Sequence, residues 1–113
     1  MPRSLIEMKA EMLKALGHPT RLAVVEFLGT QGERCVCELV EQVGGGDRTT
    51  ISKHLAVLKA SGVVSDRKEG LKVFYRLRCG CVLPFLGCIE QMVRERVQED
   101  RDALSGLSAT GPR

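Results

Sequence analysis

The chain has 113 residues and a formal net charge of +3, with 43% hydrophobic and 27% charged residues. This length suits one small domain with a modest core, and the composition is typical of a globular protein rather than a disordered one. No apolar run approaches the ~18 residues needed to cross a membrane, and the first residues do not look like a secretory signal. We therefore expect a cytoplasmic protein without a membrane partner. Its five cysteines are expected to serve metal or redox chemistry rather than disulfides.

The first third of the chain predicts two amphipathic helices. In residues 3–16 apolar side chains recur every three or four positions, so this helix is expected to serve the core, a partner subunit, or both. Pro19 suits the first turn of the second helix, because proline lacks an N–H that a helix start leaves unpaired. His18 precedes it, and we expect this histidine to cap or pack against the helix rather than to bind a metal.

A helix-turn-helix is predicted next. Residues 35–43 indicate a short helix, and the three glycines at 44–46 indicate a loose, flexible turn. The following helix is expected to begin at Asp47, whose carboxylate can accept hydrogen bonds from the first turn, and to end at Gly62. Its apolar stripe comprises Ile51, Leu55 and Leu58. Two helices joined by a short glycine-containing turn, the second one basic, are typical of a DNA reader.

Two short β-type segments, residues 63–66 and 73–77, follow with a basic loop and the turn glycine Gly70 between them. Residues 47–78 contain eight Lys and Arg and three acidic residues, a net charge of +5, whereas the segments before and after each have a net charge of −1. A basic helix fits the major groove, and a basic hairpin can lie along the phosphates beside it. We expect contacts with double-stranded operator DNA at base edges from Arg48, Thr49, Thr50, Ser52, Lys53 and His54, and at phosphates from Arg67, Lys68, Lys72 and Arg76.

A long amphipathic helix is predicted after the Cys79-Gly80-Cys81 segment, with Pro84 in its first turn. The apolar face of such a helix at the end of a small domain must pack against other apolar side chains. The obvious candidates are the equivalent helix of a second copy of the chain and the first helix. Residues 1–103 are therefore predicted to form one DNA-binding and sensing domain. Residues 104–113 are small and polar and are predicted to be a disordered tail.

Residues 13–77 resemble the arsenical-resistance-repressor (ArsR/SmtB) family of bacterial winged-helix metalloregulators. The resemblance rests on these segments, in family order and spacing: LGHPTRL (16–22), CVCEL (35–39), TISKHL (50–55), LKASGVV (58–64), RKEG (67–70) and FYRL (74–77). It implies a mainly α winged helix-turn-helix with a small β-hairpin wing. It also implies a homodimer that forms through the N- and C-terminal helices and a repressor that leaves its operator when a metal or metalloid binds.

Cys35 and Cys37 are the predicted sensing residues. Both lie at a helix start, where the pKa of a thiol is expected to fall. Positions i and i+2 of a helix point about 200° apart, so the pair can share a ligand only if Cys35 is extended. Two thiolates are too few for a closed zinc site and short of the three sulfurs that suit trivalent arsenic. Arsenite sensors of the family have a third cysteine where this chain has Val40, and its cadmium and lead sensors use N-terminal cysteines, of which residues 1–32 have none.

The remaining ligands are expected from Cys79, Cys81 or Cys88, in arrangements that the sequence leaves open. One is a single site of Cys35 and Cys37 with Cys79 or Cys81, because in winged-helix folds the segment before the third helix often pairs beside the last wing strand. Another is a separate site of Cys79, Cys81 and Cys88, the last two sharing a helix face at a spacing of seven. A redox pair without metal is the third, and Cys88 could also be a buried small hydrophobic residue.

Sulfur ligands select soft ions. Residues 93–101 lack the histidines of the family's zinc, nickel and cobalt sensors. The expected inducer is therefore As(III) or Sb(III), then Cd(II) or Pb(II), with Zn(II) or Cu(I) possible, and then thiol oxidation. An enzyme such as a thiol oxidoreductase would need a βαβ unit or a phosphate-binding loop, and neither is visible. A metal-storage or chaperone module would have no use for the basic helix and wing, and its ligand affinity would not fall steeply with salt.

Overall fold

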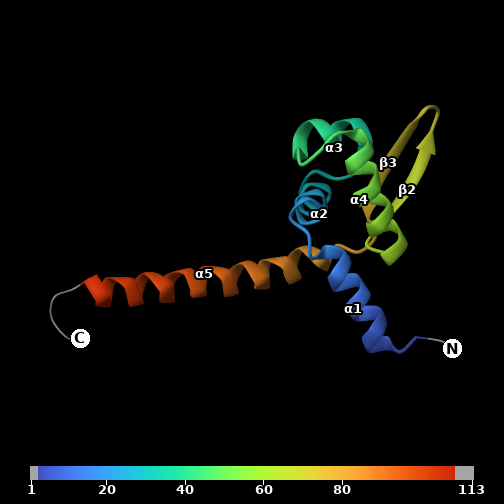
Figure 1. Cartoon of the computed structure of the whole chain (residues 1–113). Coiled ribbons are helices and arrows are strands. Elements are labelled where there is room, and N and C mark those ends of the chain that lie inside the picture. Colours follow the sequence, from blue (N-terminus) through green and yellow to red (C-terminus); the bar gives the residue numbers. More distant parts are fainter. Residues whose placement is uncertain (1–2, 109–113) are drawn as a thin grey trace. The chain divides into compact units, whose positions relative to one another are not determined.

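The structure is a computed structural model that describes residues 3–108, and the chain divides into two compact units between Gly80 and Cys81. In chain order the elements are α1 (Leu5–Leu16), α2 (Pro19–Gln31), β1 (Arg34–Cys35), α3 (Val36–Val43), α4 (Arg48–Ser61), β2 (Val64–Glu69), β3 (Lys72–Leu77) and α5 (Val82–Ser108). Helices dominate and a single small antiparallel sheet accompanies them, which confirms the predicted fold class (Figure 1). Within residues 3–108 no helix combines the length and apolar character needed to span a membrane.

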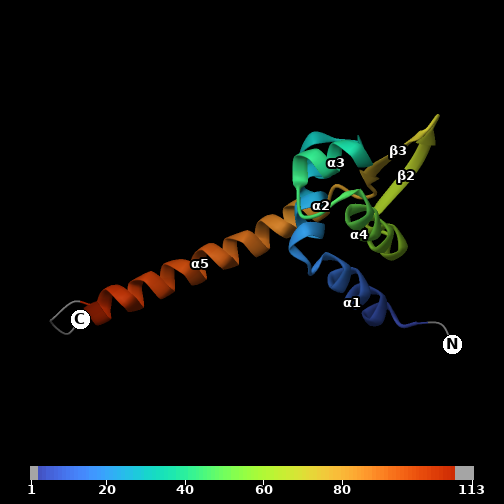
Figure 2. The same cartoon turned by 45° about the horizontal axis from the view of Figure 1, so that its top comes forward.

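Helix α4 is the central element of the first unit. It contacts α1, α2, α3 and β2, and both cartoon views place the β2–β3 hairpin beside it (Figures 1 and 2). Its predicted apolar stripe is fully buried, and α2, α3 and β2 supply most of the remaining core. The fully buried large side chains are Val24, Val25, Leu39, Ile51, Leu55, Leu58 and Val64. Burial of each such side chain contributes about 1.5–3 kcal/mol, so the core holds α4 firmly against the rest of the unit.

The predicted start of α2 and both predicted ends of α4 are confirmed. Nδ1 of His18 accepts a hydrogen bond from the backbone N–H of Thr20 at 3.1 Å, so His18 is the N-cap of α2. The Asp47 carboxylate accepts from the N–H of Thr50 at 2.9 Å and caps α4. Gly62 ends α4 in the left-handed conformation with φ 89°, which glycine adopts at little cost.

The sheet has three strands in the order β1-β3-β2, and the pairing of β1 with β3 confirms the expectation that the segment before α3 pairs beside the last wing strand. Strand β1 is only two residues long and pairs antiparallel with β3, Cys35 lying opposite Phe74. Strands β2 and β3 pair from Val64↔Leu77 to Glu69↔Lys72. The basic loop expected at residues 67–72 is therefore much shorter than predicted. Residues 67–69 and 72 lie in the strands, and only Gly70 and Leu71 form the turn. The expected start of α3 at Cys35 is also corrected, since Cys35 belongs to the strand.

The glycine turn between α3 and α4 is tightly packed rather than loose. All three glycines have positive φ, at 72°, 82° and 149°. A Cβ on Gly45 would lie 2.7 Å from Oγ1 of Thr20, and a Cβ on Gly46 would lie 2.7 Å from Cβ of Thr50. Glycine is favoured at all three positions by the backbone conformation, and at Gly45 and Gly46 also by the close approach of neighbouring side chains.

Helix α1 contributes little to the core. Only Ala15 and Leu16 are buried, while the remainder of its apolar stripe is exposed: Leu5, Met8, Met12 and Leu13. The expectation that α1 serves the core therefore holds only for the last turn of the helix. The other expected role, contact with a partner subunit, stays a prediction that this exposed stripe favours.

Helix α5, in the second unit, is longer than predicted. It continues to Ser108, so the expectation of disorder is wrong for residues 104–108, whereas residues 109–113 lie outside the described part. Ala103 and Leu104 are good helix formers, and Gln98 donates to Asp102 across one turn at 2.9 Å. These local interactions favour continuation of the helix. Large apolar side chains are exposed along it: Phe85, Ile89, Met92, Val93, Val97 and Leu104.

Candidate functional site

One face of α4 is exposed, opposite the buried stripe. Residues four apart stack in rows along a helix, and the rows of this face comprise Arg48, Thr49, Ser52, Lys53 and Ala56. Four of these were predicted to read bases. Ala56 was not among the predicted residues, although its place four residues after Ser52 puts it on the same exposed row. Small, polar and basic side chains on one face suit the major groove, where alanine can contact a thymine methyl group.

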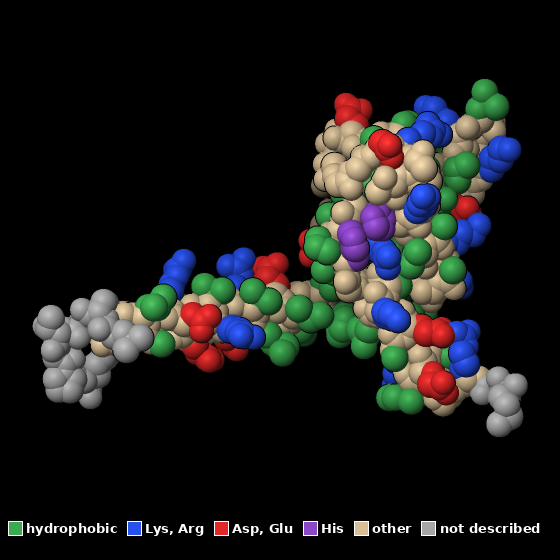
Figure 3. Space-filling model, in the orientation of Figure 1, with side chains coloured by type: hydrophobic (Ala, Val, Ile, Leu, Met, Phe, Trp, Pro, Cys, Tyr) green, Lys and Arg blue, Asp and Glu red, His purple; other side chains and the backbone are tan. Residues whose placement is uncertain are grey.

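His54 does not lie on this face, contrary to the expectation that it reads bases. Its side chain is half-buried, and its Nδ1 accepts a hydrogen bond from Nε of Arg21 at 3.1 Å. The His54 and His18 rings lie 4.5 Å apart between centroids (Figure 3). Burial lowers the pKa of His54, and the nearby His18 and Arg21 charges lower it further. His54 therefore joins α4 to the start of α2 as a neutral acceptor. Thr50 is also half-buried, at the first turn of α4.

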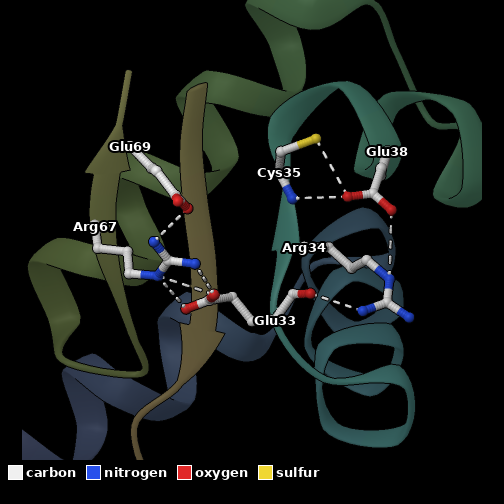
Figure 4. A network of polar contacts seen from close by, with 6 residues as sticks. All are labelled: Glu33, Arg34, Cys35, Glu38, Arg67 and Glu69. Carbon is white, nitrogen blue, oxygen red and sulfur yellow. Dashed lines mark hydrogen bonds and ion pairs between the residues drawn. The ribbon is translucent and has the colours of Figure 1, made fainter. Parts of the chain in front are cut away.

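The wing exposes Lys68, Lys72 and Arg76, as predicted for phosphate contacts. Arg67 differs from these three, because acidic side chains bind its guanidinium (Figure 4). Glu33 accepts from Nε and Nη2 of Arg67 at 2.9 and 2.6 Å, and Glu69 accepts from Nη1 at 2.8 Å. The guanidinium also lies 4.7 Å from the centroid of the Phe74 ring. In the free protein, Arg67 therefore ties the wing to the residue before β1 instead of facing solvent as an unpaired cation.

The predicted thiol pair is assembled at the start of α3. Cys35 has extended backbone angles (φ −79°, ψ 165°) as the N-cap of α3, which meets the condition for a shared ligand. Cys37 follows two residues later, in the first turn of α3. Cys35 is buried, with 3% of its surface exposed, whereas Cys37 is exposed. One oxygen of the Glu38 carboxylate accepts from both the backbone N and Sγ of Cys35, each at 3.3 Å (Figure 4).

The expected fall in the pKa of Cys35 is wrong. Its hydrogen bond with Cys37 raises the pKa, and burial raises it further, which outweighs the backbone at the helix start. The same contacts lower the pKa of Glu38, chiefly through the backbone N–H of Cys35. The ground state is therefore a protonated Cys35 thiol that donates to an ionised carboxylate. A ligand that binds Cys35 as a thiolate must displace this proton and place a negative sulfur beside Glu38.

The structure does not bring Cys79 to this pair within one chain. Cys35 is paired with Phe74, and Leu77, the last residue of β3, is already about 10 Å further along the strand. The expected proximity of Cys35 and Cys79 is therefore wrong. Within residues 3–108, no group of three or more His, Cys, Asp or Glu side chains is arranged to hold a metal ion.

The other cysteines are exposed. The carbonyl of Cys81 accepts from the N–H of Phe85 at 3.3 Å, so α5 starts directly after Cys81. This start supports the prediction that Cys81 and Cys88, seven residues apart, share a face. Cys88 is exposed in the single chain, and its expected alternative role as a buried hydrophobic residue stays a prediction for the dimer.

Two residues of the network around Cys35 were missed from the sequence. Glu38 stands three residues after Cys35, the spacing of a capping box, and that spacing could have indicated it. Glu33 contacts Arg67 across 34 positions, and no local pattern indicates such a pair. Arg34 stands between them and forms an ion pair with Glu38 at 3.6 Å.

Known proteins share both the sequence and this geometry. A family profile described as "Bacterial regulatory protein, arsR family" matches residues 18–66. The HTH-type transcriptional regulator Rv0081 of Mycobacterium tuberculosis is 34% identical over 108 residues, covering 95% of this chain and 93% of the relative. Its crystal structure superposes with a TM-score of 0.70 at 32% identity, over 88% of this chain and 98% of that one.

Two further relatives describe the fold and the family. The solution structure of the homodimeric winged helix-turn-helix DNA-binding domain Mb0332 of Mycobacterium bovis gives a TM-score of 0.72 at 30% identity, covering 84% of this chain and 86% of that one. The arsenical resistance operon repressor of Escherichia coli is 43% identical over 67 residues, which are 59% of this chain and 56% of the relative, so the match spans little more than half of that protein. The profile match and the near full-length relative lead to one conclusion: this chain belongs to the arsR family of bacterial regulatory proteins and is a DNA-binding transcriptional regulator rather than an enzyme.

Proposed function

We propose that this protein is a homodimeric repressor that binds operator DNA and releases it when a thiophilic agent binds Cys35 and Cys37. One observation carries the proposal: Cys35, the extended N-cap of α3, and Cys37 lie two residues apart at the start of α3, the helix directly before the recognition helix α4. Thiolates bind soft ions and metalloids. A ligand at this position would act on the part of the fold that orients α4.

DNA binding is assigned to the exposed face of α4 and to the wing lysines. Arg48, Thr49, Ser52, Lys53 and Ala56 would face bases in the major groove, whereas Lys68 and Lys72 would bind phosphates. Both elements belong to one compact unit, so they can bind one duplex together. A metal-storage module would not need this basic, exposed face. A salt titration separates the two functions, because only DNA binding weakens steeply with salt.

Dimerisation is assigned to the exposed apolar faces of α1 and of α5. Each face carries several large apolar side chains that water would otherwise surround. The homodimeric relative Mb0332 supports the same assembly here. Analytical ultracentrifugation tests it, and replacement of Met92 and Val93 on α5 by glutamate should yield monomers that still fold.

The signal is proposed to pass through β1 and α3. When a ligand displaces the Cys35 proton, the thiolate repels the Glu38 carboxylate, and the hydrogen bonds of Glu38 to Cys35 are lost. Cys35 is one of the two residues of β1, whose partner β3 belongs to the wing, and α3 leads through the glycine turn into α4. The recognition helices of a dimer must reach grooves ~34 Å apart. A small change in either element would therefore weaken operator binding.

The inducer is proposed to be As(III) or Sb(III), with Cd(II), Pb(II) or Zn(II) next. The Cys35–Cys37 pair supplies two sulfurs, and inorganic arsenite prefers three. The test is a titration of the reduced protein on a fluorescent duplex that the wild-type protein has selected from a random pool. Arsenite and phenylarsine oxide are compared, because the aryl group of the latter occupies one arsenic position and leaves two for thiols.

The proposal is supported if both agents release the wild-type protein from DNA and neither agent releases Cys35→Ser or Cys37→Ser. If both agents also release the Cys88→Ser control, the third arsenic ligand is not Cys88. Release by phenylarsine oxide alone would show that the pair binds without a third sulfur. If neither agent nor Cd(II) nor Pb(II) changes operator affinity, the metalloid and metal proposal is wrong.

A second candidate signal is oxidation, which the position of the two cysteines, two residues apart at the start of α3, favours. Peroxide would convert the two thiols into a disulfide, with the peroxide reduced to two waters. Mass spectrometry of the peptide that contains both cysteines would then show the loss of two hydrogens, and dithiothreitol would restore operator binding. A protein that keeps its operator affinity in peroxide would exclude this signal.

A further inference from the structure

The end of the wing carries a leucine that is almost completely exposed. Gly70 and Leu71 form the two-residue turn between β2 and β3, and the φ of 64° at Gly70 is the pattern of a type II′ turn. This turn requires glycine only at the first of its two positions. Leu71 occupies the second, and 98% of its surface is exposed. The fold therefore gives no reason for an apolar side chain at this position, where turns usually carry polar residues.

Charged side chains border this leucine. Lys72 follows it directly, and Lys68 lies in β2, opposite Val73. Both lysines are exposed, and Figure 3 shows a hydrophobic side chain at the end of the hairpin with Lys or Arg side chains beside it. Arg67, further from the turn, is bound by Glu33 and Glu69. Glu69 pairs with Lys72 across the turn, and its carboxylate accepts from Arg67 at 2.8 Å, so the end of the wing carries Leu71, two lysines and this one carboxylate.

We infer that Leu71 inserts into the minor groove of the DNA that α4 reads, while Lys68 and Lys72 bind the phosphates on either side. The inference rests on the proposed DNA-binding function. The minor groove is ~6 Å wide, too narrow for a helix, but it admits single side chains. Leucine is among the apolar residues that proteins insert there, where they partly unstack base pairs. The narrow two-residue turn projects Leu71 beyond the backbone of both strands.

The flanking lysines favour DNA over an apolar protein surface, because two ammonium groups would have to be buried or displaced at such a surface. The wing and α4 also belong to the same compact unit, and β2 contacts α4. A duplex bound by α4 would therefore pass close to the hairpin. A consequence for sequence preference follows: the 2-amino group of guanine projects into the minor groove and would obstruct the leucine, so A·T pairs are favoured at the wing position.

The experiment measures affinity and its salt dependence on a duplex selected from a random pool by the wild-type protein. Leu71→Ala is expected to lower affinity about 10-fold or more per wing, with an unchanged slope of log affinity against log salt. Lys72→Ala is the matched control and should reduce that slope by about 0.9 per subunit, because it removes one phosphate contact. Thermal unfolding of Leu71→Ala should match wild type, since the side chain is exposed in the fold.

A second duplex separates minor-groove contact from other effects. Inosine replaces guanine in the flanks, which removes the 2-amino group and leaves the major-groove edge unchanged. Wild type should bind this duplex more tightly, and Leu71→Ala should not distinguish the two. The inference is overturned if Leu71→Ala binds within about 2-fold of wild type, or if both proteins respond equally to inosine. If the wild-type protein binds no duplex at all, the proposed DNA-binding function fails. If it binds DNA but Leu71→Ala behaves like wild type, only the minor-groove inference fails.

Discussion

Replacing Glu33 with glutamine should make Arg67 available to DNA. In the free protein, Glu33 binds Nε and Nη2 of Arg67 at 2.6–3.1 Å, and Glu69 binds the remaining terminal nitrogen. Glutamine keeps the size of the side chain but removes the charge that opposes a phosphate. One added phosphate contact steepens the slope of log affinity against log salt by about 0.9, hence by about 1.8 in a dimer. Between about 50 and 200 mM salt, the variant should therefore lose roughly 12-fold more affinity than wild type does.

Fluorescence anisotropy on the selected duplex at several salt concentrations measures this slope. Glu26→Gln is the matched control, because it removes the same charge from an exposed position on α2 and should leave the slope unchanged. Arg67→Gln should also leave the slope near the wild-type value, whereas Lys72→Gln should lower it. If Arg67→Gln lowers the slope as much as Lys72→Gln does, phosphate displaces Glu33 in the complex, and the reasoning is refuted.

Three further predictions concern reactivity and stability. Iodoacetamide should alkylate the exposed Cys37 well before the buried Cys35, whose pKa is raised; peptide mapping by mass spectrometry checks this, and equal rates in the folded protein would contradict it. Because the pKa of His54 is lowered in the fold, the unfolded chain binds more protons below about pH 6.5, so the free energy of unfolding should fall as the pH drops through that value. Thermal denaturation from pH 8 to pH 5 measures the fall, which should shrink in His54→Gln. Gly62→Ala should lower the free energy of unfolding by about 1 kcal/mol, because alanine is strained at φ 89°; urea denaturation that shows no loss would contradict the assigned conformation.

Local signals account for what the sequence predicted well. The limits of α4 follow from Asp47 and Gly62, and the apolar period of the helix places Ile51 in the core. These features depend on residues within one or two turns of each other. Strand β1 has no such signal, because two residues have no period and Arg34 and Cys35 become a strand only where β3 offers a free edge.

The wrong expectations at the site have a common physical cause. Arg67 and His54 are basic or polar residues in a basic segment, and composition alone suggests that both face DNA. Their partners, Glu33 and Arg21, are more than 30 positions away in the chain, so only the tertiary fold reveals the contacts. The pKa of Cys35 is a similar case, because burial and the contact with Cys37 outweigh the helix start that the sequence indicated.

The glycine turn between α3 and α4 has a consequence for protein engineering. Gly45 packs against Thr20 of α2, and Gly46 packs against Thr50 of α4, each too closely for a Cβ atom. A recognition helix transplanted from another regulator would therefore fit only if the graft also kept the three glycines and a small residue at position 50. Chimeras joined at residue 44 and after Gly62 should keep the helix in register, whereas chimeras joined at Asp47 with a non-glycine linker should tilt it.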